Sequence, residues 1–133
     1  MKQVSKELVV HTHGRELLEI TTHINEWLRQ NSLQEGILNI FIKHTSASLT
    51  IQENADPDVL VDLLFYFEQL VEDAHPEFRH RAEGPDDMSA HIRSALTDVS
   101  LTIPVMNGAL NLGTWQGVYV FEHRTSLIHG GLS

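Results

Sequence analysis

His44 opens a stretch of residues that could bind a metal ion and a phosphate, HTSASLTIQENADPDV at positions 44–59. A neutral imidazole is a common metal ligand, and the hydroxyls of Ser46 and Ser48 can bind a phosphate or orient a ligand histidine. The alternative for His44 is structural, because a partly buried histidine is often satisfied by a backbone carbonyl. The pattern therefore predicts either a metal and phosphate site or a polar bend of the chain.

Glu53 and two polar residues that follow it, Asn54 and Asp56, have competing explanations. Glu53 continues the odd-numbered apolar face of Ala47 and Ile51. An unpaired carboxylate is costly there, so Glu53 needs a cation, an arginine or the edge of a cleft. The sequence Asn-Ala-Asp-Pro favours entry into a helix, and Asp56 fits a helix cap better than a metal ligand.

Two pairs of residues farther along the chain could also do chemistry. Asp87 and His91 are four residues apart on a predicted helix, so they are either a metal ligand with its neighbour or a surface pair. Glu122 and Arg124 end an apolar strand on one face, where polar groups often form the mouth of a pocket. An internal salt bridge between these two side chains explains the same pattern equally well.

The segment LGTWQG at positions 112–117 places Trp115 and Gln116 between two glycines. Such glycines let backbone N–H groups approach an anion, although a turn that carries a core tryptophan explains them as well. The motifs of P-loop, Rossmann, zincin and α/β-hydrolase proteins do not occur. We assign no role to the histidines in turn or loop settings, which are His11, His13, His75, His80 and His129.

The composition excludes several classes of function. Nine basic and eighteen acidic residues give a formal charge of -9, which opposes binding to nucleic acid and to anionic lipid. Cysteine is absent, so any metal ligands are histidines or carboxylates. The chain has no apolar run of about 18 residues, as a membrane span needs, and its N-terminus lacks the pattern of a signal peptide. We therefore expect a cytoplasmic protein with no nucleic-acid or membrane partner.

Two strands and a helix are expected before the polar stretch. Residues 3–12 and 15–20 read as strands around a turn at His13-Gly14, which predicts a β-hairpin. Thr21 or Thr22 then caps a short helix.

A buried strand is expected at 37–43, immediately before the polar stretch. Its apolar residues occupy even positions, whereas the apolar residues after His44 occupy odd positions. Because strand side chains alternate strictly, this switch predicts a bend or bulge near His44 or Thr45.

Local signals also define the rest of the chain. Asp56-Pro57-Asp58 starts a helix that extends to about Glu72, and Gly84-Pro85-Asp86-Asp87 starts another. A strand at 100–105, a favoured hairpin turn at Asn107-Gly108, the segment ALNL at 109–112 and a strand at 117–124 predict a β-meander. Helices between strand pairs, without strict βαβ alternation, predict the α+β class with a largely antiparallel sheet.

Three segments in this order closely resemble the YjbQ family, also called UPF0047 or the secondary thiamine-phosphate synthase family: positions 44–59, DDMSAHI at 86–92 and LNLGTWQGVYVFEHR at 110–124. The resemblance implies a single YjbQ-like domain over 1–133, a largely antiparallel β-sandwich with two main helices, and a homotrimer. It also implies a modest thiamine-phosphate synthase activity, which joins hydroxymethylpyrimidine diphosphate to thiazole phosphate and releases diphosphate.

The family motifs also imply roles for individual residues. A divalent metal ion, Zn²⁺ or Mg²⁺ or Mn²⁺, would bind His44, His91 and Asp87, with Glu122 as a further ligand or an orienter. Catalytic roles fall to Glu53, Glu122 and Arg124, and contacts with a small phosphorylated substrate fall to Ser46, Ser48, Asn54, Trp115, Gln116 and Arg124. The competing functions are a noncatalytic trimeric protein that binds a metal or small anion, and an unassigned metal-dependent hydrolase.

Overall fold

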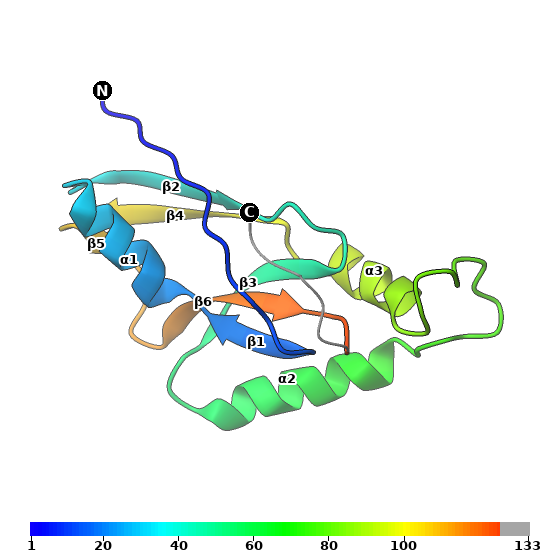
Figure 1. Cartoon of the computed structure of the whole chain (residues 1–133). Coiled ribbons are helices and arrows are strands. Elements are labelled where there is room, and N and C mark those ends of the chain that lie inside the picture. The colour runs from blue at the N-terminus through cyan, green and yellow to red at the C-terminus, as the bar shows by residue number, and fades with distance from the viewer. Residues whose placement is uncertain (126–133) are drawn as a thin grey trace.

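Two three-stranded antiparallel sheets pack against each other in the computed structural model, which describes residues 1–125 (Figure 1). Sheet A has the order β1-β6-β3, from Glu16–Glu19, Gln116–Glu122 and Ala47–Glu53. Sheet B has the order β2-β4-β5, from Gly36–Phe41, Ser100–Met106 and Ala109–Leu110. The helices are α1 at Thr21–Gln30, α2 at Pro57–Leu70 and α3 at Asp87–Ala95. The predicted α+β class and antiparallel sandwich are confirmed.

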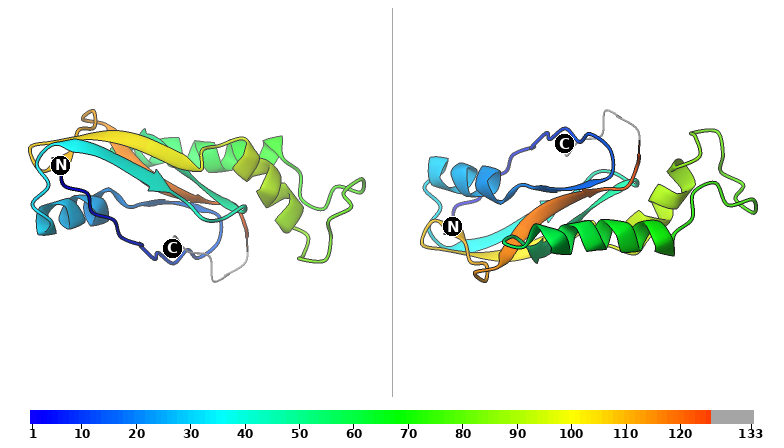
Figure 2. Two further views of the ribbon diagram at one scale, coloured as in Figure 1. Left: turned by 90° about the horizontal axis from the view of Figure 1, so that it is seen from above. Right: turned by 90° about the horizontal axis from the view of Figure 1, so that it is seen from below.

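The hydrophobic core lies between the two sheets. Leu49 and Val118 of sheet A and Ile103 of sheet B are at most 2% exposed, and Leu28 of α1 closes one side of this layer. Sheet A also has a covered outer face, because α2 lies across it (Figure 2). There the rings of Phe67 and Phe121 meet edge to face with their centroids 5.1 Å apart.

The predicted change of face near His44 is confirmed, and its cause is a crossing between sheets. Leu38 and Ile40 of β2 are half-buried while the residues beside them are exposed, and Ala47 and Leu49 of β3 are buried. The chain between them leaves sheet B and enters sheet A. His44 therefore lies on irregular backbone, as the sequence predicts.

The predicted N-terminal hairpin is wrong in its first strand. Residues 3–12 form no ladder, although Leu8, Val10 and Thr12 turn inward in alternation. The chain does turn at Gly14, whose φ of +123° suits glycine, and a Cβ at that position would lie 2.9 Å from the Thr125 carbonyl oxygen. Before this turn the segment descends from above β2 to the level of sheet A, where β1 begins (Figure 1).

The helix starts differ in how they are capped. Asp56 accepts a hydrogen bond from the Asp58 amide at 2.9 Å and caps α2 as predicted. The predicted threonine cap of α1 is wrong: Ile20 occupies that position, and the Thr21 hydroxyl accepts from the Val118 amide instead. At α3 the carboxylate of Asp86 likewise makes no cap bond, because Arg124 and Thr125 occupy it.

The predicted turn at Asn107-Gly108 joins β4 to β5, and both residues have positive φ, at 52° and 79°. Within residues 1–125 no helix has both the length and the apolar character that crossing a bilayer requires.

Candidate metal centre

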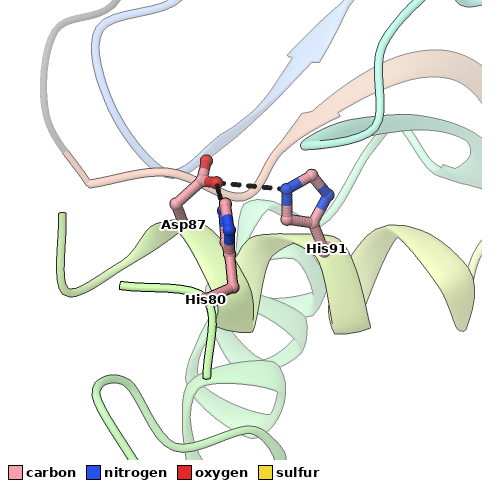
Figure 3. A group of neighbouring side chains, drawn as sticks. All are labelled: His80, Asp87 and His91. Atoms are coloured by element: carbon pink, nitrogen blue, oxygen red, sulfur yellow. Dashed lines mark hydrogen bonds and ion pairs between the residues drawn. The ribbon is translucent and has the colours of Figure 1, made fainter. Parts of the chain in front are cut away.

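His80, Asp87 and His91 converge at the start of α3 (Figure 3). The Asp87 carboxylate oxygen Oδ2 lies 2.6 Å from Nε2 of His80 and 3.1 Å from Nε2 of His91. The three potential ligand atoms all lie within 4.8 Å of one another. Two imidazoles and one carboxylate are donors that Zn²⁺ and other divalent transition ions accept.

The three side chains come from two elements. Asp87 and His91 are four residues apart on α3, so helical geometry places them on one face. His80 lies in the segment 71–86 that joins α2 to α3 and reaches Asp87 from outside the helix. Ligand atoms about 2.1 Å from a tetrahedral ion are roughly 3.4 Å apart, so small side-chain shifts would let this group hold one.

Asp87 is prepared to act as an anionic ligand. Burial opposes its ionisation, but the hydrogen bond from His80 and the positive charge of Arg124 outweigh burial and lower its pKa. Its second oxygen, Oδ1, lies 3.2 Å from the Arg124 guanidinium. One oxygen therefore faces the two imidazoles while the other is fixed by a cation.

Arg124 is engaged by protein groups. Its Nη2 donates to Oδ1 of Asp86 at 3.1 Å and to the Glu83 carbonyl at 2.7 Å, and the Asp86 contact raises its pKa. Burial opposes the ionisation of Asp86, but hydrogen bonds from Arg124 and Thr125 lower its pKa to about 2. The structure thus places Arg124 behind the His80, Asp87 and His91 group, as a support for Asp87.

His44 lies outside this group of three. It lines an open groove with Thr45, Ser46 and Val99, at the crossing between the sheets. Within residues 1–125 the histidine that joins Asp87 and His91 is His80, to which the sequence analysis assigns no role. Within the described residues, His44 is therefore not a member of the group of three potential ligands.

Ser48 and Glu122 lie near the end of sheet A where Ala47 pairs with Glu122. Both side chains are buried and have hydrogen-bond partners. Ser48 is 0% exposed, and its hydroxyl lies 2.8 Å from Nε2 of His123. Glu122 is 3% exposed and accepts hydrogen bonds from the Thr12 hydroxyl at 2.6 Å and the His123 amide at 3.0 Å. Glu122 makes no side-chain ion pair with Arg124 in the described structure. Each of the two side chains bonds to other protein groups instead.

The other predicted residues lie at the opposite end of sheet A. Glu53 pairs with Gln116 in the β3–β6 ladder, whereas Ala47 pairs with Glu122 at the far end. Six residue steps along a strand separate the two ends by roughly 20 Å.

Polar groups at that opposite end hold local turns. Asn54 donates to the Gln116 carbonyl at 3.1 Å, and the Gln116 side chain accepts from the Gly113 amide at 2.8 Å. Glu53 accepts from the Ala55 amide, while Trp115 is 63% exposed. One protomer does not bring these four residues to the His80, Asp87 and His91 group.

The relatives found by sequence comparison all belong to one protein family. The family described as UPF0047 protein YjbQ-like matches residues 6–129. UPF0047 protein sll1880 of Synechocystis sp. is 50% identical over 123 residues, which cover 92% of this chain and 84% of the relative. UPF0047 protein YjbQ of Escherichia coli O157:H7 is 39% identical over 95% of this chain and 89% of the relative. None of these names states an activity.

Solved structures show the same fold. The crystal structure of the conserved hypothetical protein TT1486 from Thermus thermophilus matches with a TM-score of 0.82 and 36% identity, covering 90% of both chains. A YjbQ/UPF0047 protein from Clostridium acetobutylicum matches with a TM-score of 0.82 and 33% identity, covering 90% of this chain and 91% of that one.

Proposed function

The chain belongs to the YjbQ-like UPF0047 family, and from this premise we propose that it is a metal-dependent enzyme acting on phosphorylated substrates. The observation that carries the proposal is the convergence of His80, Asp87 and His91 on one point, with a support for Asp87 from Arg124. Three protein ligands leave a tetrahedral ion with one position for water or substrate, which is the arrangement of catalytic rather than structural sites. His80 and His91 are 40% and 34% exposed at the side chain, so a substrate can approach.

The reaction that fits is a modest thiamine-phosphate synthase activity. The ring nitrogen of thiazole phosphate attacks the methylene carbon of hydroxymethylpyrimidine diphosphate, a C–N bond forms, and the C–O bond breaks with its electron pair on the departing diphosphate. A bound divalent ion, Zn²⁺ or Mg²⁺ or Mn²⁺, supplies positive charge for that leaving group. The attack needs no protein nucleophile, which agrees with a chain without cysteine.

The chain's own residues have positioning roles in this proposal. His80 and His91 each present an imidazole nitrogen, and Asp87 presents one carboxylate oxygen. Arg124 fixes the other oxygen of Asp87, so it orients a ligand and adds positive charge close to the place where diphosphate develops. Ser46, in the groove beside His44, is the predicted phosphate contact whose hydroxyl has no hydrogen bond within the described structure.

An assay of thiamine phosphate formation tests the proposal. The parent protein, freed of metal by a chelator and reloaded with Zn²⁺, Mg²⁺ or Mn²⁺ in turn, is expected to regain activity with at least one ion. His80→Ala and His91→Ala variants should lose about 100-fold or more of it, since each removes a ligand. His13→Ala, at an exposed histidine outside the group, is the matched control. Activity that survives in both ligand variants would contradict the assignment.

A noncatalytic protein that binds a metal or a small anion is the second candidate. The engagement of Arg124 by Asp86, Asp87 and Glu83 favours it, because this cation is not free to hold a phosphate. The assay separates the two: a protein that binds Zn²⁺ through His80 and His91 but forms no thiamine phosphate is the binding protein.

We also propose that the protein is a homotrimer, as the family resemblance implies. The supporting observation is α2, which has no fully buried residue and whose outer face exposes Val61, Phe65, Tyr66 and Leu70, each by more than half. Large apolar side chains that gather on the exposed side of one helix often mark a protein–protein contact. Subunit assembly through this face would bury these four side chains.

A further inference from the structure

The segment 71–86 is anchored at its two ends. Near its start, Asp73 lies 2.7 Å from the Arg15 guanidinium and accepts a hydrogen bond from the Ser89 hydroxyl. Near its end, the Glu83 carbonyl and the Asp86 carboxylate both accept from Arg124. These contacts fix where the segment leaves α2 and where it enters α3.

The middle of this segment has mainly internal contacts. The Phe78 amide donates to the His75 carbonyl at 3.0 Å, and Arg81 donates to the Phe78 and Pro76 carbonyls. Within the described structure, residues 75–82 make one hydrogen bond to another element, from His80 to Asp87. Figure 1 shows this segment as a loop that projects beyond α3.

His80 thus makes the hydrogen bond that holds the middle of the loop to α3, and it is also one of the three potential metal ligands. The other two ligands, Asp87 and His91, are held by the helix whether or not the loop is docked. An ion bound to all three would exchange one hydrogen bond for coordination bonds that span two elements. Because such an ion gains its third ligand only when the loop is docked, it binds the docked loop more tightly and shifts the equilibrium toward docking.

We propose that residues 75–82 form a metal-latched loop: a divalent ion bound to His80 shifts the loop toward its docked position on α3, and loss of the ion raises the population of the released loop. The inference rests on the proposed metal centre and assigns it a second consequence, control over the loop that borders the open coordination position. Metal binding would then fix the position of the loop beside the coordination position that a substrate would occupy.

The sequence supplies a direct reporter of docking. Arg79 and Arg81 lie on either side of His80, so trypsin can cut the chain next to the ligand itself. Backbone must leave its folded path to enter a protease, and the cleavage rate therefore follows the population of the released loop. Lys6, in the N-terminal segment away from the metal centre, is an internal reference site.

Limited trypsin digestion of the full chain, followed by mass spectrometry, tests the latch. The metal-free protein and the protein saturated with Zn²⁺ are compared, and a short peptide substrate checks that Zn²⁺ leaves trypsin active. We expect Zn²⁺ to slow cleavage after Arg79 and Arg81 by about tenfold or more, while cleavage after Lys6 is unchanged. The substitution His80→Asn should remove the protection, whereas His75→Asn, within the same loop, should retain it.

A separate titration calorimetry measurement distinguishes the two ways in which the result could be negative. If Zn²⁺ binds one to one but leaves cleavage after Arg79 and Arg81 unchanged, the latch is wrong and the metal centre stands. If none of Zn²⁺, Mg²⁺ and Mn²⁺ binds in this measurement, both the latch and the proposed function are wrong. Protection that persists in His80→Asn would also overturn the latch, because the loop would then be held without its ligand.

Discussion

The two oxygens of Asp87 have different partners, and this division explains the geometry of the candidate metal centre. Oδ2 faces His80 and His91, while Oδ1 lies against Arg124. A ligand carboxylate that is fixed from behind loses little conformational freedom when it binds an ion. Arg124 should therefore contribute to metal affinity without touching the metal.

Substitution of Arg124 by glutamine is expected to weaken Zn²⁺ binding by about 10-fold to 100-fold, the usual effect of losing a group that orients a ligand. Titration calorimetry measures this change. Arg29→Gln, at an exposed arginine near the end of α1, is the control and should bind Zn²⁺ as the parent does. Equal affinities in the two variants would show that Arg124 plays no part in the site.

His123 is a buried imidazole that should make stability depend on pH. Burial lowers its pKa to about 3, helped by the nearby charges of Arg93 and Arg15. The unfolded chain binds a proton at this residue below about pH 6.5, whereas the folded chain does not until about pH 3. The free energy of unfolding should therefore fall by up to about 1.4 kcal/mol per pH unit as the pH drops through this window.

Urea denaturation at pH 7, 6 and 5 measures the slope. His123→Gln keeps a side chain that can bond to Ser48 but cannot titrate, so its stability should depend less on pH in this range. The lowered pKa values of Asp73, Asp86 and Asp87 act below about pH 4, where the loss of their charge also destabilises the fold. Identical slopes for parent and variant would rule out the assignment to His123.

At the scale of elements, one buried arginine connects α2, α3 and β6. Arg93 of α3 is 2% exposed and donates to the carbonyls of Phe67 and Val71 at the end of α2, at 3.3 and 2.7 Å. It also donates to the His123 carbonyl at 3.3 Å. The last carbonyls of a helix need partners, and a cation there complements the helix dipole.

Replacement of Arg93 by methionine should lower the free energy of unfolding by about 3 kcal/mol. The Val71 carbonyl loses its donor, the carbonyls of Phe67 and His123 each lose one of two donors, and Asp73 loses a cation 3.6 Å away. Urea denaturation compares this variant with Arg29→Met, in which an exposed arginine is removed and little change is expected. A loss below about 1 kcal/mol for Arg93→Met would mean that water replaces the arginine at these carbonyls.

Local signals account for the elements that can be predicted well from the sequence. The Asp56-Pro57 start of α2, the turn at Asn107-Gly108 and the change of face near His44 each depend on neighbouring residues. The strand expected at 3–12 is wrong because a ladder also needs a paired neighbour, which alternation of side chains does not supply. The contact of His80 with Asp87 could not be predicted from the sequence either. A loop that has no regular repeat brings the two side chains together.

At the scale of the whole molecule, the residues of the family motifs fall into two groups at opposite ends of sheet A. Arg124, Asp87 and His91 lie at one end, and Glu53 and Gln116 lie at the other. The family motifs include residues at both ends. Their order along the sequence does not show how far apart these residues lie in space. The α2 face that would join subunits lies on the outer side of the same sheet (Figure 2).

Substitution of Phe65 by lysine should disrupt the proposed homotrimer, since a charge would replace a ring that is 61% exposed in the protomer. Light scattering coupled to size-exclusion chromatography measures the mass in solution. Gln30→Lys, at an exposed polar position on α1, is the control and should remain trimeric. A parent protein that is monomeric at all concentrations would contradict assembly.

Anomalous diffraction from crystals soaked in Zn²⁺, recorded on both sides of the zinc absorption edge, tests the metal centre most directly. The account predicts one strong peak about 2.1 Å from the Nε2 atoms of His80 and His91 and from Oδ2 of Asp87. A peak on His44 without His80, or no peak at these three residues at full soaking, would contradict it.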